Sequence, residues 1–141
     1  MIPAFVSDPH ITRLLLTLAI IAFGYLTYRL INFLILLRAS SHSNTVINFS
    51  LGKPVLLYFT TPGCTPCKTI QRPAIHRVQE IVGSRLEVVE IDASMQPQVA
   101  SQWGVISVPT TFLIDSNGKP RHVNYGLAGV DKLLNQLEDM V

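Results

Sequence analysis

Residues 58–68 read YFTTPGCTPCK, and this stretch decides the fold. It holds both cysteines of the chain, Cys64 and Cys67, where an apolar strand-like run gives way to a helix-like run. Two thiols at positions i and i+3 of a starting helix lie on one face, close enough to bond without backbone movement. The helix N-terminus carries partial positive charge, which favours the thiolate of Cys64. Because the thiolate is the species that attacks a disulfide, Cys64 is predicted as a nucleophile and Cys67 as its resolving partner.

An apolar segment precedes this stretch. Leu14–Leu37 spans 24 residues with a single charge, Arg29, in a chain of 141 residues. At about 1.5 Å per helical residue it is long enough to cross the hydrocarbon core of a bilayer, about 30 Å thick. We therefore predict a transmembrane helix at 14–37 after an N-terminal tail at 1–13. For Arg29 we favour snorkelling toward the nearer interface over a contact with a partner helix or a lipid phosphate.

A cleaved signal peptide is the alternative for this segment. Such a peptide has a basic start and an apolar run of about 7–15 residues before a small-residue cleavage site. The chain has no Lys or Arg before Arg13, and its apolar run is longer than that. We therefore expect an uncleaved anchor held in membrane lipid.

The part of the chain after this segment is electrically neutral. Residues 42–141 contain eight Lys or Arg and eight Asp or Glu. A neutral domain offers no basic surface for nucleic acid, so no nucleic-acid partner is predicted. Two cysteines cannot complete a four-thiolate zinc site, and neither His76 nor His122 has a cysteine at ligand spacing. We predict neither a metal nor a cofactor.

The pattern of apolar runs predicts an α/β domain at 45–141, joined to the apolar segment by a polar linker at 38–44. Strands are expected at 45–49, 55–59, 86–91, 110–114 and 122–125. Helices are expected after the cysteines, at 97–103 and near the C-terminal end. This order implies a mixed sheet of four or five strands with helices on both faces.

Two of the expected helices are marked by apolar residues at helical spacing. The positions are Ile70, Ala74, Val78 and Ile81 in the first of these helices, and Val130, Leu133, Leu134 and Leu137 in the last. Pro73 falls inside the first helix and should kink it. Trp103, at the end of the middle helix, is predicted to be a packing residue of the core.

Three motifs in a fixed order resemble the thioredoxin superfamily over 45–141. They are Cys64-Thr65-Pro66-Cys67 at a strand-to-helix junction, Val108-Pro109-Thr110 before a strand, and the turn Asn117-Gly118 followed by Gly126. The resemblance implies a thioredoxin fold and partners that are protein disulfides or dithiols, with an unidentified electron donor or acceptor.

The same resemblance implies a substrate-binding surface. It implies a cis bond between Val108 and Pro109, opposite the cysteines, and a Val108 backbone that pairs with an extended segment of the substrate. The implied substrate-binding residues are Gly63, Thr65, Pro66, Val108 and Pro109.

The chain departs from the family pattern in four places. Gly63 stands where typical thioredoxins have Trp before the first cysteine. Tyr58 stands in place of a buried acid that helps the second cysteine lose its proton, and Val88 in place of its companion lysine. The helix proline, Pro73, comes one residue later than usual. These departures indicate a specialised relative, in which deprotonation of Cys67 must rely on water, nearby hydroxyls or the substrate.

Together these features predict a membrane-anchored thiol–disulfide oxidoreductase. Whether it reduces or oxidises its partners stays open, because CxxC pairs do both. The alternatives are a redox-inert docking module with a structural disulfide and a dithiol that binds a thiophilic ion such as Cu(I). The flanking residues Arg13 and Arg38 lean toward a cytoplasmic domain, whereas anchors of small redox domains more often hold them outside. We prefer an extracytoplasmic domain.

Overall fold

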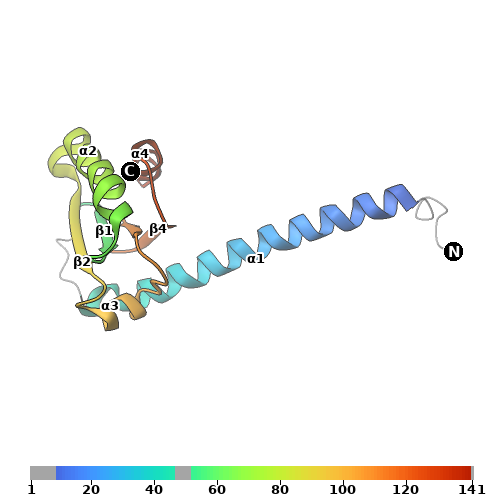
Figure 1. The fold of residues 1–141 in the computed structure, drawn as a ribbon, viewed down its shortest axis with the longest axis horizontal. Helices are drawn as coiled ribbons and strands as arrows, with labels where there is room; N and C mark the ends of the chain where they lie inside the picture. The colour runs from blue at the N-terminus through green and yellow to red at the C-terminus, as the bar shows by residue number, and fades with distance from the viewer. Residues whose placement is uncertain (1–8, 47–51, 141) are drawn as a thin grey trace. The chain divides into compact units, whose positions relative to one another are not determined.

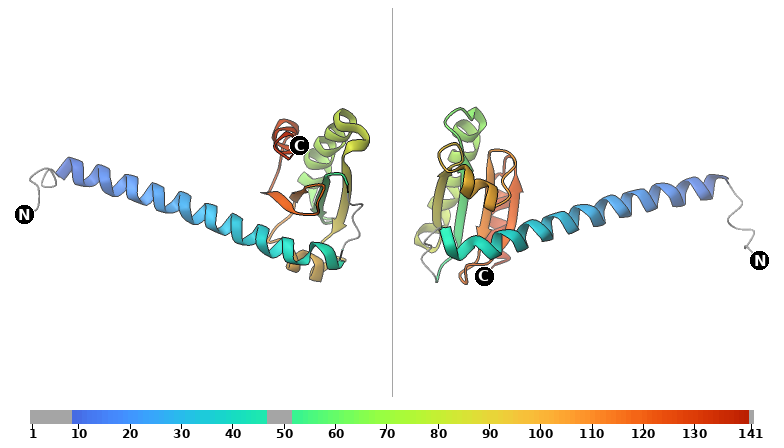
Figure 2. Two further views of the ribbon diagram at one scale, coloured as in Figure 1. Left: turned by 180° about the vertical axis from the view of Figure 1, so that it is seen from behind. Right: turned by 90° about the horizontal axis from the view of Figure 1, so that it is seen from below.

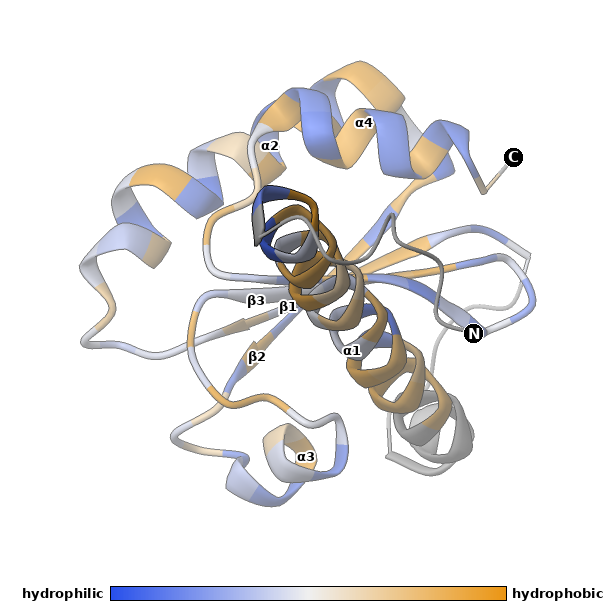
Figure 3. Cartoon of the chain, turned by 90° about the vertical axis from the view of Figure 1, so that its right-hand side faces the viewer, coloured by the Kyte–Doolittle hydropathy of each residue, from blue (hydrophilic) through white to orange (hydrophobic). Residues whose placement is uncertain are grey.

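The structure is a computed structural model that describes residues 9–46 and 52–140, with side chains at 10–37 and 52–140. It divides into two units, Met1–Leu34 and Ile35–Val141. The helix α1 (Pro9–Val46) begins in the first unit. In the part of the chain that the structure describes, His10–Leu37 is the one segment long and apolar enough to cross a membrane. Figure 3 shows α1 as predominantly apolar, in orange.

The predicted transmembrane helix at 14–37 falls within this segment. A signal sequence near the N-terminus meets the same criteria of length and composition, so the membrane span stays a prediction. Arg29 lies one helical turn after Tyr25, with its guanidinium 3.5 Å from the tyrosine hydroxyl and 6.0 Å from the ring centroid.

The segment 38–44, predicted as a linker, is helical in the structure, because α1 continues through it to Val46. Thr45 and Val46, the start of an expected strand at 45–49, are helical as well. Residues 38–46 contain neither Gly nor Pro, so nothing in the sequence ends the helix there. The rest of the expected strand lies outside the described residues.

The second unit contains a mixed four-stranded sheet. Its strands are β1 (Val55–Thr60), β2 (Glu87–Asp92), β3 (Thr110–Ile114) and β4 (Pro120–Tyr125), in the order β2-β1-β3-β4. β1 is parallel to β2, and β3 is antiparallel to both β1 and β4 (Figure 1). Four of the predicted strands are therefore present. The continuous apolar run predicted at 55–59 is a central strand with every residue buried.

Helices cover both faces of the sheet, as predicted. α2 (Arg72–Val82) and α4 (Val130–Glu138) lie over one face, and α3 (Pro97–Gln102) lies over the other (Figure 2). Alternate residues of β1 point to opposite faces because successive side chains of a strand do so. Leu56 and Tyr58 therefore face α2 and α4, whereas Leu57 and Phe59 face α3.

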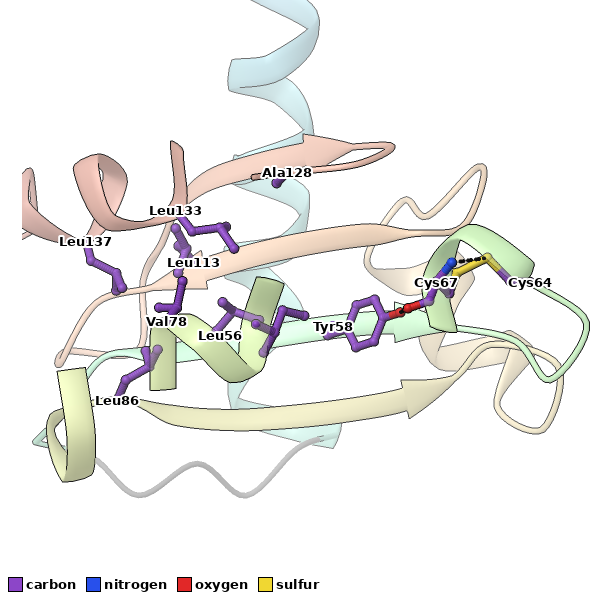
Figure 4. Packing of buried hydrophobic residues seen from close by; sticks show 11 residues of the cluster. Leu56, Tyr58, Cys64, Cys67, Val78, Leu86, Leu113, Ala128, Leu133 and Leu137 are labelled. Atoms are coloured by element: carbon purple, nitrogen blue, oxygen red, sulfur yellow. Dashed lines mark hydrogen bonds between the residues drawn. A yellow bond between two sulfur atoms is a disulfide. The ribbon is translucent and has the colours of Figure 1, made fainter. Parts of the chain in front are cut away.

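The core has two parts, separated by the sheet. The disulfide-side core consists of Leu56, Tyr58, Cys64, Cys67, Ile75, Val78, Leu86, Leu113, Ala128, Leu133 and Leu137 (Figure 4). The aromatic core consists of Val55, Leu57, Phe59, Ile91, Val99, Ala100, Trp103, Phe112 and Ile114. Both cysteines thus belong to the face covered by α2 and α4.

The helix after the cysteines differs from its prediction because it is not a regular α-helix throughout. Its first part is a π-helical segment, η2 (Cys67–Gln71), and a short 3₁₀ turn, η3 (Gly83–Arg85), follows α2. The kink expected at Pro73 stays a prediction, and the π segment ends just before this proline. Proline has no N–H to donate to the carbonyl of Thr69, four residues back.

The buried stripe of this helix is only partly the predicted one: Val78 is fully buried and Ala74 partly buried, as predicted. Ile70 and Ile81 are 53% and 52% exposed. The residues that face the core are Cys67, Gln71, Ile75 and Val78. Apolar spacing misplaced the two ends of the stripe because a polar residue, Gln71, occupies one of the buried positions.

Candidate active site

The two cysteines form a disulfide at the start of the helix. The Cα atoms of Cys64 and Cys67 are 5.3 Å apart, and the amide N–H of Cys67 donates to the sulfur of Cys64 at 3.2 Å (Figure 4). The turn after β1 is closed by the N–H of Cys64, which donates to the carbonyl of Thr61 at 3.1 Å. A backbone N–H aimed at Sγ of Cys64 would stabilise a thiolate there after reduction.

The two sulfur-bearing residues differ in exposure. Cys64 is 8% exposed and Cys67 is fully buried. Cys64 is preceded by the exposed residue Gly63 and followed by the exposed residues Thr65 and Pro66. Solvent and a partner therefore reach the disulfide from the side of Cys64.

Tyr58 is fixed against the resolving position. Its side chain is 1% exposed, and its hydroxyl donates to the carbonyl of Cys67 at 3.2 Å. The same carbonyl accepts the backbone N–H of Arg72, which closes the π turn. Burial raises the pKa of Tyr58, and only part of this rise is offset by its hydrogen bond to Thr60. The tyrosine is thus a neutral donor where the family resemblance implies an acid.

An ion pair lies beside this tyrosine. The guanidinium of Arg72 bonds the carboxylate of Glu90 at 2.5 Å, with both side chains more than 40% exposed. The bond to Glu90 raises the pKa of Arg72 above its usual value. Glu90 acts on Tyr58 through charge alone, and its field adds to the rise of the pKa of Tyr58.

The Val108–Pro109 peptide bond is cis. Val108 packs against the disulfide-side core, which contains both cysteines. The carbonyl of Pro109 accepts the N–H of Gly126 at 2.8 Å, so the proline loop is joined to the segment that follows β4. Val108 also packs against the aromatic core, so the position of this segment opposite the cysteines stays a prediction of the family resemblance.

Gln71 is a residue that the sequence analysis did not single out. Its side chain is fully buried, and its amide bonds both backbone groups of Ala128. The amide nitrogen donates to the Ala128 carbonyl at 3.1 Å, and the amide oxygen accepts the Ala128 N–H at 2.8 Å. Its position was visible in the sequence, because a residue four places after Cys67 shares its helix face.

The remaining candidates lie away from this cluster. His76 is exposed, and His122 is half-buried on β4, where burial lowers its pKa. Within the described ranges, no group of three or more His, Cys, Asp or Glu side chains is placed to hold a metal ion. Trp103 is a core residue, as predicted: it is fully buried and packs edge-on against Phe112, with ring centroids 5.1 Å apart.

Comparison with known proteins points to one family. Residues 34–139 match the family model described as Thioredoxin. Thioredoxin Y, chloroplastic, from Oryza sativa subsp. japonica is 35% identical over 86 residues, which cover 61% of this chain and 50% of that protein. A thioredoxin from Mycobacterium bovis is 33% identical over 92 residues, which cover 65% of this chain and 78% of that protein.

A solved structure agrees with these sequence matches. The structure of a mutant thioredoxin from Halobacterium salinarum NRC-1 superposes with a TM-score of 0.56 and 28% sequence identity. The superposition covers 63% of this chain and 75% of that one. The thioredoxin fold is therefore shared over most of the second unit.

Proposed function

Because this chain belongs to the thioredoxin family, we propose that it is a membrane-anchored thiol–disulfide oxidoreductase that exchanges disulfides with protein partners. The observation that carries the proposal is the Cys64–Cys67 disulfide at a helix start, with only Cys64 in contact with solvent. The greater exposure of Cys64 supports its role as the nucleophile and that of Cys67 as the resolving thiol. Gly63, Thr65 and Pro66 on one side and the Val108–Pro109 segment on the other form the proposed partner-binding surface.

In the reducing direction, the thiolate of Cys64 attacks one sulfur of the partner's disulfide. That disulfide breaks, a mixed disulfide forms, and the released partner thiolate takes a proton from water. Cys67 then loses its proton and attacks Sγ of Cys64. The mixed disulfide breaks, the second partner thiolate is protonated, and the Cys64–Cys67 bond is restored. Two electrons pass to the partner, and the oxidising direction is the reverse.

The deprotonation of Cys67 takes place without a carboxylate at position 58. Tyr58 is protonated at neutral pH, as any tyrosine of ordinary pKa is, and burial raises its pKa further. The proton of Cys67 therefore leaves to water or to the departing partner thiolate.

The proposed location rests on α1. His10–Leu37 is long and apolar enough to hold the domain at a bilayer. We place the domain on the extracytoplasmic side, where an unidentified membrane or soluble dithiol or disulfide would exchange electrons with it. A topology reporter fused after Val141 tests this placement, and a cytoplasmic signal would contradict it.

The activity is tested with the full chain in detergent micelles. Cys64→Ser should abolish dithiothreitol-driven reduction of insulin, whereas Cys67→Ser should accumulate mixed disulfides with partners. Since the chain has two cysteines, each variant is the matched control of the other. If neither variant differs from wild type, the proposed activity is wrong.

A redox-inert docking module is the second candidate. It is favoured by the low exposure of the disulfide, 8% at Cys64 and none at Cys67. A structural disulfide has a reduction potential below about −300 mV, whereas exchanging pairs lie at about −270 to −120 mV. Equilibration with glutathione and dithiothreitol buffers therefore separates the two candidates.

A further inference from the structure

The side chain of Gln71 forms the pair of hydrogen bonds that a neighbouring backbone segment would form. Its amide offers a C=O and an N–H to the N–H and C=O of Ala128, at 2.8 and 3.1 Å. This is the two-bond pattern by which neighbouring strands exchange hydrogen bonds. A fully buried glutamine satisfied in this way fixes the chain at Ala128 to the helix that carries Cys67.

The segment that contains Ala128 is bound on its other side as well. The N–H of Gly126 donates to the carbonyl of Pro109 at 2.8 Å. Just before it, the hydroxyl of Tyr125 donates to the carbonyl of Gly104 at 3.1 Å. The 126–129 loop is thus tied to the proline loop at one end and to the cysteine helix at the other.

Leu127 is the residue between these two ties. Its neighbours Gly126 and Ala128 are both hydrogen-bonded to elements of the redox site, yet its own side chain is 45% exposed. An exposed leucine on a backbone fixed at both adjacent residues loses little conformational freedom when it is covered. It is therefore suited to contact a protein partner.

We propose that Gln71 is a positioning residue of the redox site, which holds the 126–129 loop so that Leu127 contacts protein partners docked at Cys64. This inference rests on the proposed function. Gln71 touches neither the sulfur atoms nor the partner, so its effect passes through Ala128. Small disulfides that reach Cys64 without covering Leu127 should be insensitive to it.

The test compares two disulfides and two glutamines in the full chain in detergent micelles. Gln71→Met keeps the volume and removes both bonds to Ala128. Gln136→Met is the matched control, because the side chain of Gln136 also forms two hydrogen bonds, at 2.9 and 3.0 Å, but forms them with the side chain of Asn124 and not with the backbone of the 126–129 loop. We expect Gln71→Met to lower kcat/KM for insulin about tenfold, the scale of losing an apolar contact such as that of the exposed part of Leu127. The rate with oxidised glutathione should stay within about twofold, and Gln136→Met should leave both rates within about twofold.

The link to Leu127 is tested by a double-variant cycle. Leu127→Ala should reproduce the selective loss with insulin. The double variant Gln71→Met, Leu127→Ala should be no slower than either single variant, because both changes remove one contact. Additive losses, or equal losses with insulin and oxidised glutathione, would overturn the proposal.

The proposal can still be tested if Gln71→Met does not fold or if the wild type is inactive. If Gln71→Met does not fold, the selective loss in Leu127→Ala and slow hydrogen exchange at the Ala128 amide of the wild type must both be found. Failure of either one overturns the inference. If the wild type reduces neither insulin nor oxidised glutathione, the proposed function itself is wrong, a result distinct from a variant that fails to discriminate.

Discussion

The hydroxyl of Tyr58 donates a 3.2 Å hydrogen bond to the carbonyl oxygen of Cys67. The bond joins the central strand to the first residue of η2, across the interior of the disulfide-side core. The tyrosine therefore holds the backbone at Cys67 and leaves its sulfur without a neighbouring carboxylate at position 58.

Tyr58→Phe should destabilise the oxidised protein by about 1 kcal/mol, since it removes one buried hydrogen bond without changing the ring. Tyr125→Phe is the matched control. Its hydroxyl donates to Gly104 at 3.1 Å from an exposed position, where water replaces the lost donor. Denaturant unfolding measures both, and equal losses would show that the Tyr58 bond contributes nothing beyond a surface contact.

Asp115→Asn should reduce the loss in the free energy of unfolding that occurs as the pH falls below about 4. The Asp115 carboxylate is 5% exposed, and this burial raises its pKa. The N–H groups of Lys119, Arg121 and Asn117 outweigh the burial and hold the pKa below 3.8. Because the folded pKa lies below the unfolded one, its stabilisation is present above about pH 4 and is lost as pH falls through the folded value.

At neutral pH the same variant should cost about 1–3 kcal/mol, the scale of hydrogen bonds to a charged group. Asparagine keeps one acceptor oxygen for the turn but loses the charge that pairs with Arg121 at 2.6 Å. Unfolding by urea at a series of pH values measures both effects. Asp131→Asn, at an exposed position of α4, is the control, and an unchanged loss of stability at acid pH in Asp115→Asn would contradict the prediction.

Gly63→Ala should be neutral or stabilise the fold by about 0.5 kcal/mol. A Cβ at Gly63 has nothing within 4 Å, and its φ is not positive. Alanine then lowers the entropy of the unfolded chain at no structural cost. Gly126→Ala should instead destabilise by about 1 kcal/mol or more, because Gly126 has φ +81°. Thermal unfolding of the two variants checks the pair, and a loss at Gly63 as large as at Gly126 would contradict it.

The fluorescence of Trp103 should respond little to reduction of the disulfide. Trp103 is the one tryptophan of the chain and is fully buried against Phe59 and Phe112 in the aromatic core. The cysteines belong to the disulfide-side core, across the sheet. Emission spectra before and after dithiothreitol measure this, with iodide quenching as a control for burial. A large change in intensity on reduction would show that the sheet does not isolate the two cores.

Much of the fold was predictable because its signals are local and consistent. The run at 55–59 is apolar without interruption, and it forms a strand buried on both faces. The two cysteines stand at the junction of this strand with a helix, and they form the disulfide. The ordered motifs indicated the fold, and the match over residues 34–139 shows it.

Prediction from the sequence failed at one buried polar residue and at the end of one helix, which no Gly or Pro marks. Ile70 and Ile81 marked a helix face by their hydrophobicity, whereas the buried position belongs to Gln71. Its burial depends on Ala128, 57 residues away in the chain, and no local pattern reports such a bond. The end of α1 was placed too early because polar composition at 38–46 was taken as a linker, although polar residues without Gly or Pro are compatible with a helix.

The π-helical segment η2 also accounts for the position of the proline. A π turn closes over one residue more than an α turn. Pro73 stands one residue later than the family resemblance implies, and η2, directly behind Cys67, is where one turn of the helix holds one extra residue. In a regular α-helix, one extra residue would rotate all the residues that follow it around the helix axis. Here it is absorbed within a single turn, and Ile75 and Val78 still face the core beyond the proline.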